Sequence, residues 1–102
     1  MILAQVEGSI VATKKNEKMM GSKFLLVRPL YVDSPASKEF KKGTSTLVAV
    51  DQLGAGEGEL VLIVQGSSAR NAVKDKEQPV DAVVVGIVDT IDIARNVIYK
   101  AH

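Results

Sequence analysis

The 102-residue sequence contains no cysteine and a single histidine, His102, its last residue. Without cysteine there is no disulfide framework, thiolate metal site or cysteine nucleophile. A Ser–His–Asp triad needs an imidazole that a third group holds in place, and a zinc site needs several nitrogen or sulfur ligands. One terminal histidine meets neither requirement, so we expect no metal, no cofactor and no enzymatic activity.

Long hydrophobic runs and an excess charge of one sign are also absent. The longest nearly apolar stretch, Ala82–Val88, has seven residues, whereas a membrane-spanning helix needs about 20. The apolar run at the start is interrupted at Gln5 and Glu7, too early for a signal peptide. Thirteen basic and 12 acidic residues give a net charge of +1, which argues against nucleic acid as the main partner. We therefore expect no membrane and no nucleic-acid partner, and one globular domain over residues 1–102.

Valine and isoleucine dominate the apolar residues, with 15 Val and 7 Ile against 8 Leu. These β-branched residues favour strands. Apolar and polar residues alternate over 2–12, which predicts a half-buried strand that bends at Gly8. Pro29 is expected to make the far half of the strand predicted at residues 24–32 an edge or a break. Five further strands are predicted at residues 24–32, 46–50, 59–65, 82–90 and 96–100. The pattern indicates an all-β sandwich or barrel, with strand 82–90 buried on both faces.

One short helix is predicted at Ser68–Lys74. Ser67 or Ser68 is expected to cap its first turn, and Gln78-Pro79 to end it. Three aspartates, Asp81, Asp89 and Asp92, flank the most apolar strand and are interpreted as turn and strand-end residues.

The small net charge hides an uneven distribution. Residues 14–42 carry eight basic and three acidic side chains, a net charge of +5, and the rest of the chain is −4. The basic residues form either solvated loops or a contact with an acidic partner or nucleic acid. Barrels that bind single strands normally present stacking aromatics, and only four aromatic residues are available. An OB-like module for single-stranded nucleic acid or an acidic protein is the alternative function.

The glycine-rich segment Asp51–Glu59 does not predict a phosphate loop. Such a loop leads into a helix whose N–H groups meet the phosphate, whereas a strand pattern follows here and Glu57 and Glu59 would repel an anion. Its three glycines permit positive φ and the close approach of another backbone, which in a small protein can belong to a neighbouring subunit.

Five segments together resemble the EutN/CcmL family of bacterial microcompartment shell proteins, the pentamers at shell vertices. They occur in the family's order and at family-like spacing, and they are Leu3–Lys14, Gly21–Val27, Val48–Glu59, Gly66–Arg70 and Pro79–Asp89. Residues 32–43 match no family segment clearly and are interpreted as a variable loop.

The resemblance implies a small five-stranded, OB-like β-barrel with one short helix that assembles as a cyclic pentamer. It also implies a structural role in the bacterial cytoplasm, where the pentamer closes the corners of a shell tiled mainly by hexameric proteins. The residues that match the two family signatures are expected at the subunit interface or the axial opening: Gly54, Ala55, Gly56, Gly58, Glu59, Ser67, Ser68, Ala69 and Arg70.

Overall fold

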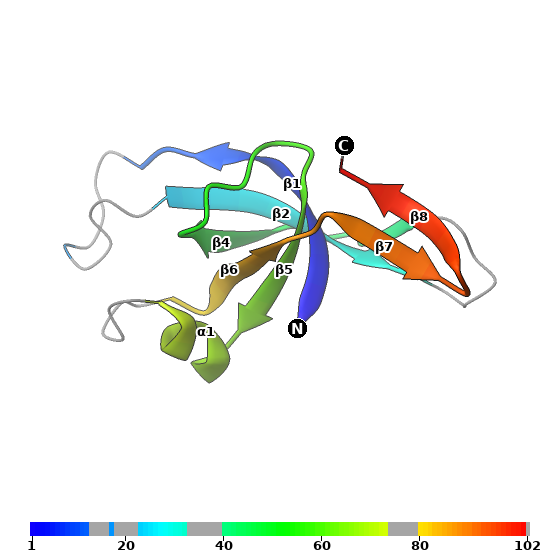
Figure 1. Cartoon of the computed structure of the whole chain (residues 1–102). Coiled ribbons are helices and arrows are strands. Elements are labelled where there is room, and N and C mark those ends of the chain that lie inside the picture. Colours follow the sequence, from blue (N-terminus) through cyan, green and yellow to red (C-terminus); the bar gives the residue numbers. More distant parts are fainter. Residues whose placement is uncertain (13–16, 18–22, 33–39, 74–79, 102) are drawn as a thin grey trace.

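The computed structural model describes residues 1–12, 17, 23–32, 40–73 and 80–101 (Figure 1). Within these ranges the elements are β1 (Ile2–Ile10), β2 (Lys23–Tyr31), β3 (Lys41–Lys42), β4 (Leu47–Asp51), β5 (Leu60–Gln65), α1 (Ser67–Ala72), β6 (Ala82–Ile87), β7 (Thr90–Ile93) and β8 (Asn96–Lys100).

Five of the strands close into a barrel in the order β1–β5–β6–β4–β2, and β2 pairs back to β1. Every pairing in the barrel is antiparallel except that of β4 with β6. The two-residue β3 extends the sheet beyond β2, and β7 and β8 form a separate hairpin that projects from the barrel (Figure 1). The predicted five-stranded barrel with one short helix is confirmed.

The barrel interior follows from the period-two alternation of the strands. On β1, Ala4 and Val6 point inward and are at most 2% exposed, and Leu25 and Val27 on β2 do the same. Complete burial of each large aliphatic side chain contributes about 1.5–3 kcal/mol. The interior cluster consists of Ala4, Val6, Leu25, Val27, Ala49, Ala55, Val61, Ile63, Ala82 and Val84.

The bend expected at Gly8 is present as a β-bulge. The register of β1 against β2 shifts between Val6, which pairs with Val27, and Gly8, which pairs with Leu26. A bulge sharpens the local twist and bends the strand. The first half of β1 can therefore pair with β5 while its full length follows β2, and this closes the barrel.

Helix α1 connects β5 to β6 and packs against both strands (Figure 1). The prediction of a serine cap was wrong. The N-cap is Gly66, whose φ of 64° favours glycine, and no side chain accepts a capping hydrogen bond. The helix also ends at Ala72, earlier than expected, while Pro79 lies outside the described residues. Its apolar face joins a second cluster with the outer side of β4 and β6: Val50, Ala69, Val73, Val80 and Val83.

The prediction of a single strand over 82–90 needs correction, whereas the prediction that Pro29 makes an edge or a break in the second strand is confirmed as an edge. The apolar stretch 82–90 is not one strand, because β6 ends at Ile87 and the chain turns into β7. Burial on both faces holds for Ala82–Val84, where α1 covers the outer side, whereas Val85 is exposed. Pro29 does not break β2. The far half of β2 nevertheless loses its pairing with β4 and gains only the short β3, as an edge position requires.

Candidate functional site

The glycine-rich loop, residues 52–59, connects β4 to β5 and is organised by the carboxylate of Asp51. This side chain is fully buried. It accepts hydrogen bonds from three successive backbone N–H groups, those of Leu53 (2.9 Å), Gly54 (3.2 Å) and Ala55 (2.8 Å). The carboxylate therefore fixes the first half of the loop in a single tight turn.

Lys23 balances the charge of Asp51. Its ammonium Nζ lies 3.9 Å from Asp51 Oδ2 and donates a hydrogen bond to the carbonyl of Ala55 at 3.3 Å. Half of the Lys23 side chain remains exposed. Solvent screening therefore weakens the ion pair, and the backbone N–H groups are the main partners of the carboxylate.

The second half of the loop is tied to β1. Gly56 N–H donates to Glu59 Oε1 at 2.5 Å, and Glu59 N–H donates to the Gly56 carbonyl at 3.1 Å. Val6 N–H donates to the Glu59 carbonyl (2.9 Å), while the Val6 carbonyl accepts from Gly58 N–H (2.8 Å). The side chain of Gln5 donates to the Gly58 carbonyl at 3.3 Å. The loop is thus a fixed extension of the barrel wall beside the β1 bulge.

The glycines of the loop have different roles within the chain. Gly54 and Gly58 have φ values of 89° and 86°, which residues with a side chain rarely adopt. A Cβ at either position would have nothing within 4 Å. At Gly56 a Cβ would lie 3.1 Å from Glu59 Oε1. Gly54 and Gly58 thus permit a backbone conformation that other residues rarely adopt, and they leave open space beside them.

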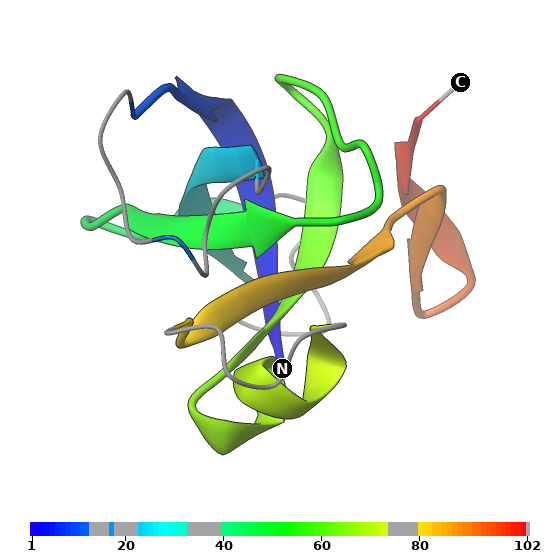
Figure 2. The same cartoon turned by 90° about the vertical axis from the view of Figure 1, so that its left-hand side faces the viewer.

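The second signature lies elsewhere on the barrel. The loop precedes β5 and α1 follows it, so the two signatures lie at opposite ends of this six-residue strand, about 20 Å long, as Figure 2 shows. Ser67 and Ser68 are exposed, and Ala69 is buried in the second cluster. Arg70 belongs to α1, but its side chain lies outside the described residues. One chain does not bring the two signatures together.

Sequence reasoning singled out no exposed apolar side chains. Leu53 projects from the glycine-rich loop and is 52% exposed, and Val48 and Val85 are exposed on β4 and β6. Because strand side chains alternate, Val48 and Val85 lie on the outer side of the barrel. The sequence gives no sign of this, because β4 and β6 are apolar at successive positions. Among the residues that the structure describes, the exposed large hydrophobic ones are Met1, Ile10, Val11, Tyr31, Val32, Val48, Leu53, Val85 and Val97.

The basic segment 14–42 is partly used inside the chain. Arg28 pairs with Glu7 at 2.8 Å and donates to the Gly43 carbonyl at 2.9 Å. Lys23 is engaged at the loop, whereas Lys41 and Lys42 are exposed and form no ion pair with any described residue. The other four basic residues, Lys14, Lys15, Lys18 and Lys38, lie outside the described residues.

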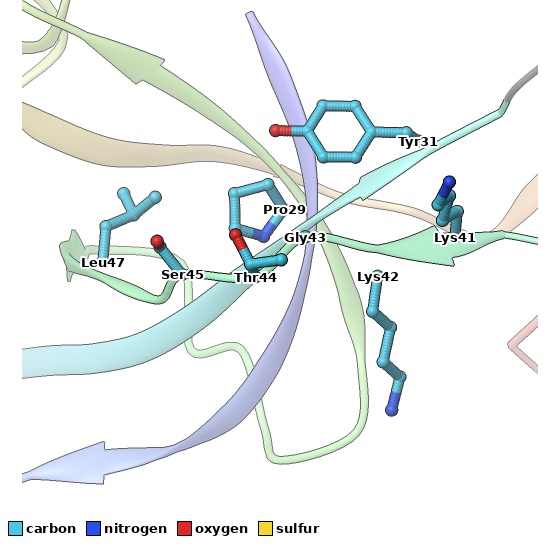
Figure 3. Close-up of a pocket in the computed structure, with 8 residues that line it drawn as sticks. All are labelled: Pro29, Tyr31, Lys41, Lys42, Gly43, Thr44, Ser45 and Leu47. Carbon is cyan, nitrogen blue, oxygen red and sulfur yellow. The ribbon is translucent and has the colours of Figure 1, made fainter.

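A hollow of about 320 Å³ lies at the far end of β2 (Figure 3). We call it the β2–β3 hollow. It is lined by Pro29, Tyr31, Lys41, Lys42, Gly43, Thr44, Ser45 and Leu47. Among the described residues no cluster of three or more His, Cys, Asp or Glu side chains could hold a metal ion. In the same part of the chain, no helix is long and apolar enough to cross a membrane.

Comparison with known proteins gives a consistent set of relatives. The family model described as "Ethanolamine utilisation protein EutN/carboxysome" matches residues 1–89. The microcompartment shell vertex protein PduN of Salmonella typhimurium is 45% identical over 91 residues, which cover 89% of this chain and 98% of PduN. The carboxysome shell vertex protein CcmL of Synechococcus elongatus is 39% identical over 99 residues, covering 97% of this chain and 94% of CcmL.

A solved structure agrees in fold. The GrpN pentameric microcompartment shell protein from Rhodospirillum rubrum superimposes with a TM-score of 0.75 at 42% identity. The match covers 90% of this chain and 98% of GrpN. These comparisons give no support to the nucleic-acid alternative.

Proposed function

Because the chain belongs to the EutN/CcmL family, we propose that it is a vertex protein of a bacterial microcompartment shell and assembles as a cyclic pentamer. The observation that carries this proposal is the match of the family model to residues 1–89, which contain every strand of the closed barrel. Pentameric GrpN matches 90% of this chain at 42% identity.

The proposed role is geometric. A contact that joins one surface of a subunit to a different surface of the next closes into a ring. A ring of five inserted among six-fold tiles introduces curvature, so hexameric shell proteins are the expected neighbours. We propose no catalytic activity, because the chain has no cysteine and a single histidine, and its buried carboxylate, Asp51, is occupied by backbone donors.

We propose that the glycine-rich loop and α1 contribute to the subunit contacts. In a head-to-tail ring the two surfaces that meet come from different chains, so their separation along β5 is no obstacle. The loop is prepared for such a contact, because Asp51 and β1 fix its shape before assembly and Leu53 is exposed on it. The open space beside Gly54 and Gly58 permits another chain to approach closely.

Native mass spectrometry of the purified chain tests the proposal. We expect a species at five times the chain mass of 10.9 kDa, and no salt-dependent binding of a fluorescent single-stranded oligonucleotide. Co-expression with a hexameric shell protein should then give closed shells in electron micrographs, and shells with open corners when the chain is omitted. A monomer that binds the oligonucleotide would contradict the proposal and favour the alternative function.

A further inference from the structure

The β7–β8 hairpin has little contact with the rest of the chain. Apart from each other, β7 and β8 make no extensive contact with any other described strand or helix. A backbone hydrogen bond from Ala101 N–H to the Asp89 carbonyl (2.8 Å) closes its base. A two-stranded hairpin alone is at best marginally stable in water, so this element needs a surface to pack on.

One face of the hairpin combines an apolar and an acidic side chain. Val97 is 61% exposed, and its cross-strand partner is Asp92, which is also exposed. Directly paired residues point to the same face of a sheet. Asp92 is the only carboxylate on β7 and β8, and it forms no ion pair with a described residue. The hairpin therefore presents an aliphatic contact beside a free negative charge.

The hairpin lies beyond the part of the chain that defines the family. The family model ends at residue 89, and β7 begins at Thr90. GrpN is covered almost completely by nine-tenths of this chain and is pentameric. The family model is therefore complete without the hairpin. CcmL of Synechococcus elongatus, by contrast, matches nearly the whole chain.

The β2–β3 hollow complements that face. Tyr31, 55% exposed, pairs with Lys41 across the two strands, and Pro29 and Leu47 complete an apolar lining. Lys41 has no acidic partner among the described residues. Figure 3 shows Lys41 on the same side of the strands as the Tyr31 ring, with Lys42 directed to the other side. The hollow thus offers an apolar surface beside a free positive charge.

We propose that the β7–β8 hairpin of each subunit docks in the β2–β3 hollow of the next copy in the ring. Val97 then packs against Tyr31 and Asp92 pairs with Lys41. Figure 1 shows the hairpin and the far end of β2 at the same end of the barrel, and in Figure 2 they lie to either side of it. Each chain therefore presents two separate surfaces, as a head-to-tail contact requires. The proposal rests on the proposed pentamer and adds a second contact to it.

Charge exchange between the two surfaces tests this docking. We expect Asp92→Lys and Lys41→Asp each to raise the protein concentration at which the pentamer dissociates by about tenfold, measured by native mass spectrometry on dilution. The double variant should restore the wild-type value. Lys42→Asp is the matched comparison. The Lys42 side chain is directed to the other side of the strands (Figure 3), so this variant should shift dissociation less than Lys41→Asp does. If the double variant instead dissociates at the concentration that the sum of the two single effects gives, the two side chains do not pair and the proposal is overturned.

Cross-linking identifies the occupant. The chain has no cysteine, so in Val97→Cys/Tyr31→Cys a short bismaleimide should give a ladder of linked chains up to the pentamer. A linked monomer or no product would overturn the proposal. A chain without residues 90–102 should still form the ring, but the ring should dissociate more easily. If that ring is as stable as the wild type but no longer co-assembles with a hexameric shell protein, the hairpin contacts the hexameric protein and the proposal is overturned. A full-length chain that is monomeric at every concentration refutes the proposed function itself.

Discussion

Replacement of Asp51 should disorganise the glycine-rich loop without affecting the barrel topology. Its carboxylate accepts three backbone N–H groups. In Asp51→Ala, water can hydrate Leu53 and Gly54, which are exposed, but not Ala55, which is 1% exposed. Loss of a hydrogen bond to a charged group costs about 1.5–3 kcal/mol, and a buried unsatisfied donor about 1–3 kcal/mol. We expect a total destabilisation of about 3 kcal/mol.

Asp51→Asn separates charge from shape. The amide keeps one acceptor oxygen for Leu53 and Gly54 but turns a donor toward the N–H of Ala55, so we expect a loss of about 2 kcal/mol. Urea unfolding at a fixed protein concentration measures both variants, because assembly contributes to the stability of a ring. For a chain of this size, 1 kcal/mol corresponds to about 4–8 °C in Tm.

Lys23→Met is the control for the ion pair. Its ammonium is half-exposed and 3.9 Å from the carboxylate, so we expect a loss below about 1 kcal/mol. If Lys23→Met destabilised the chain as much as Asp51→Asn, the ion pair rather than the backbone donors would hold the loop. That result would refute the reasoning.

Three further predictions concern backbone conformation. Gly58→Ala should lower the free energy of unfolding, measured in urea, by about 1–2 kcal/mol because φ at this residue is 86°. Gly8 has an ordinary φ and open space beside it, so Gly8→Ala should change stability by less than about 0.5 kcal/mol. Equal effects of the two variants would contradict this prediction. Gly56→Val should abolish the pentamer in light scattering while the chain stays folded, since only the Glu59 side chain has to move within the chain; an intact ring would exclude Gly56 from the interface. Ala94 and Arg95 form the hairpin turn with positive φ values of 49° and 67°, which an Asn-Gly pair tolerates. Ala94→Asn/Arg95→Gly should therefore slow amide hydrogen exchange in β7 and β8. Unchanged exchange would show that the turn is not strained.

The barrel could be predicted from the sequence because β-branched residues dominate its strands and because apolar and polar residues alternate along the first strand. Ala4 and Val6 lie inside as their spacing requires, and the glycine at position 8 marks the bulge. The hairpin could be predicted only in its second strand, residues 96–100, which β8 confirms. Its turn, Ala94-Arg95, has none of the residues that usually adopt positive φ, and the apolar run through Val88 conceals the end of β6.

The candidate site could be predicted only in part from the sequence. The glycine signature marks a real loop, but the organising residue is Asp51, and a carboxylate at a strand end gives no sign in the sequence that three backbone donors will surround it. The expected serine cap failed because Gly66, at φ 64°, already makes the turn into α1, and its carbonyl accepts the N–H of Ala69 at 3.1 Å. The nine signature residues remain predicted contacts of the ring.

The position of β5 has a mechanical consequence. This strand is hydrogen-bonded on both sides, to β1 and to β6, and the loop and α1 are attached to its two ends. A strand paired on both edges is stiff, so the angle between the two attached surfaces is fixed within each chain. In a five-subunit ring that uses both surfaces, β5 then sets the tilt of each subunit relative to the ring axis. The curvature of such a ring is therefore fixed before any other shell protein packs against it.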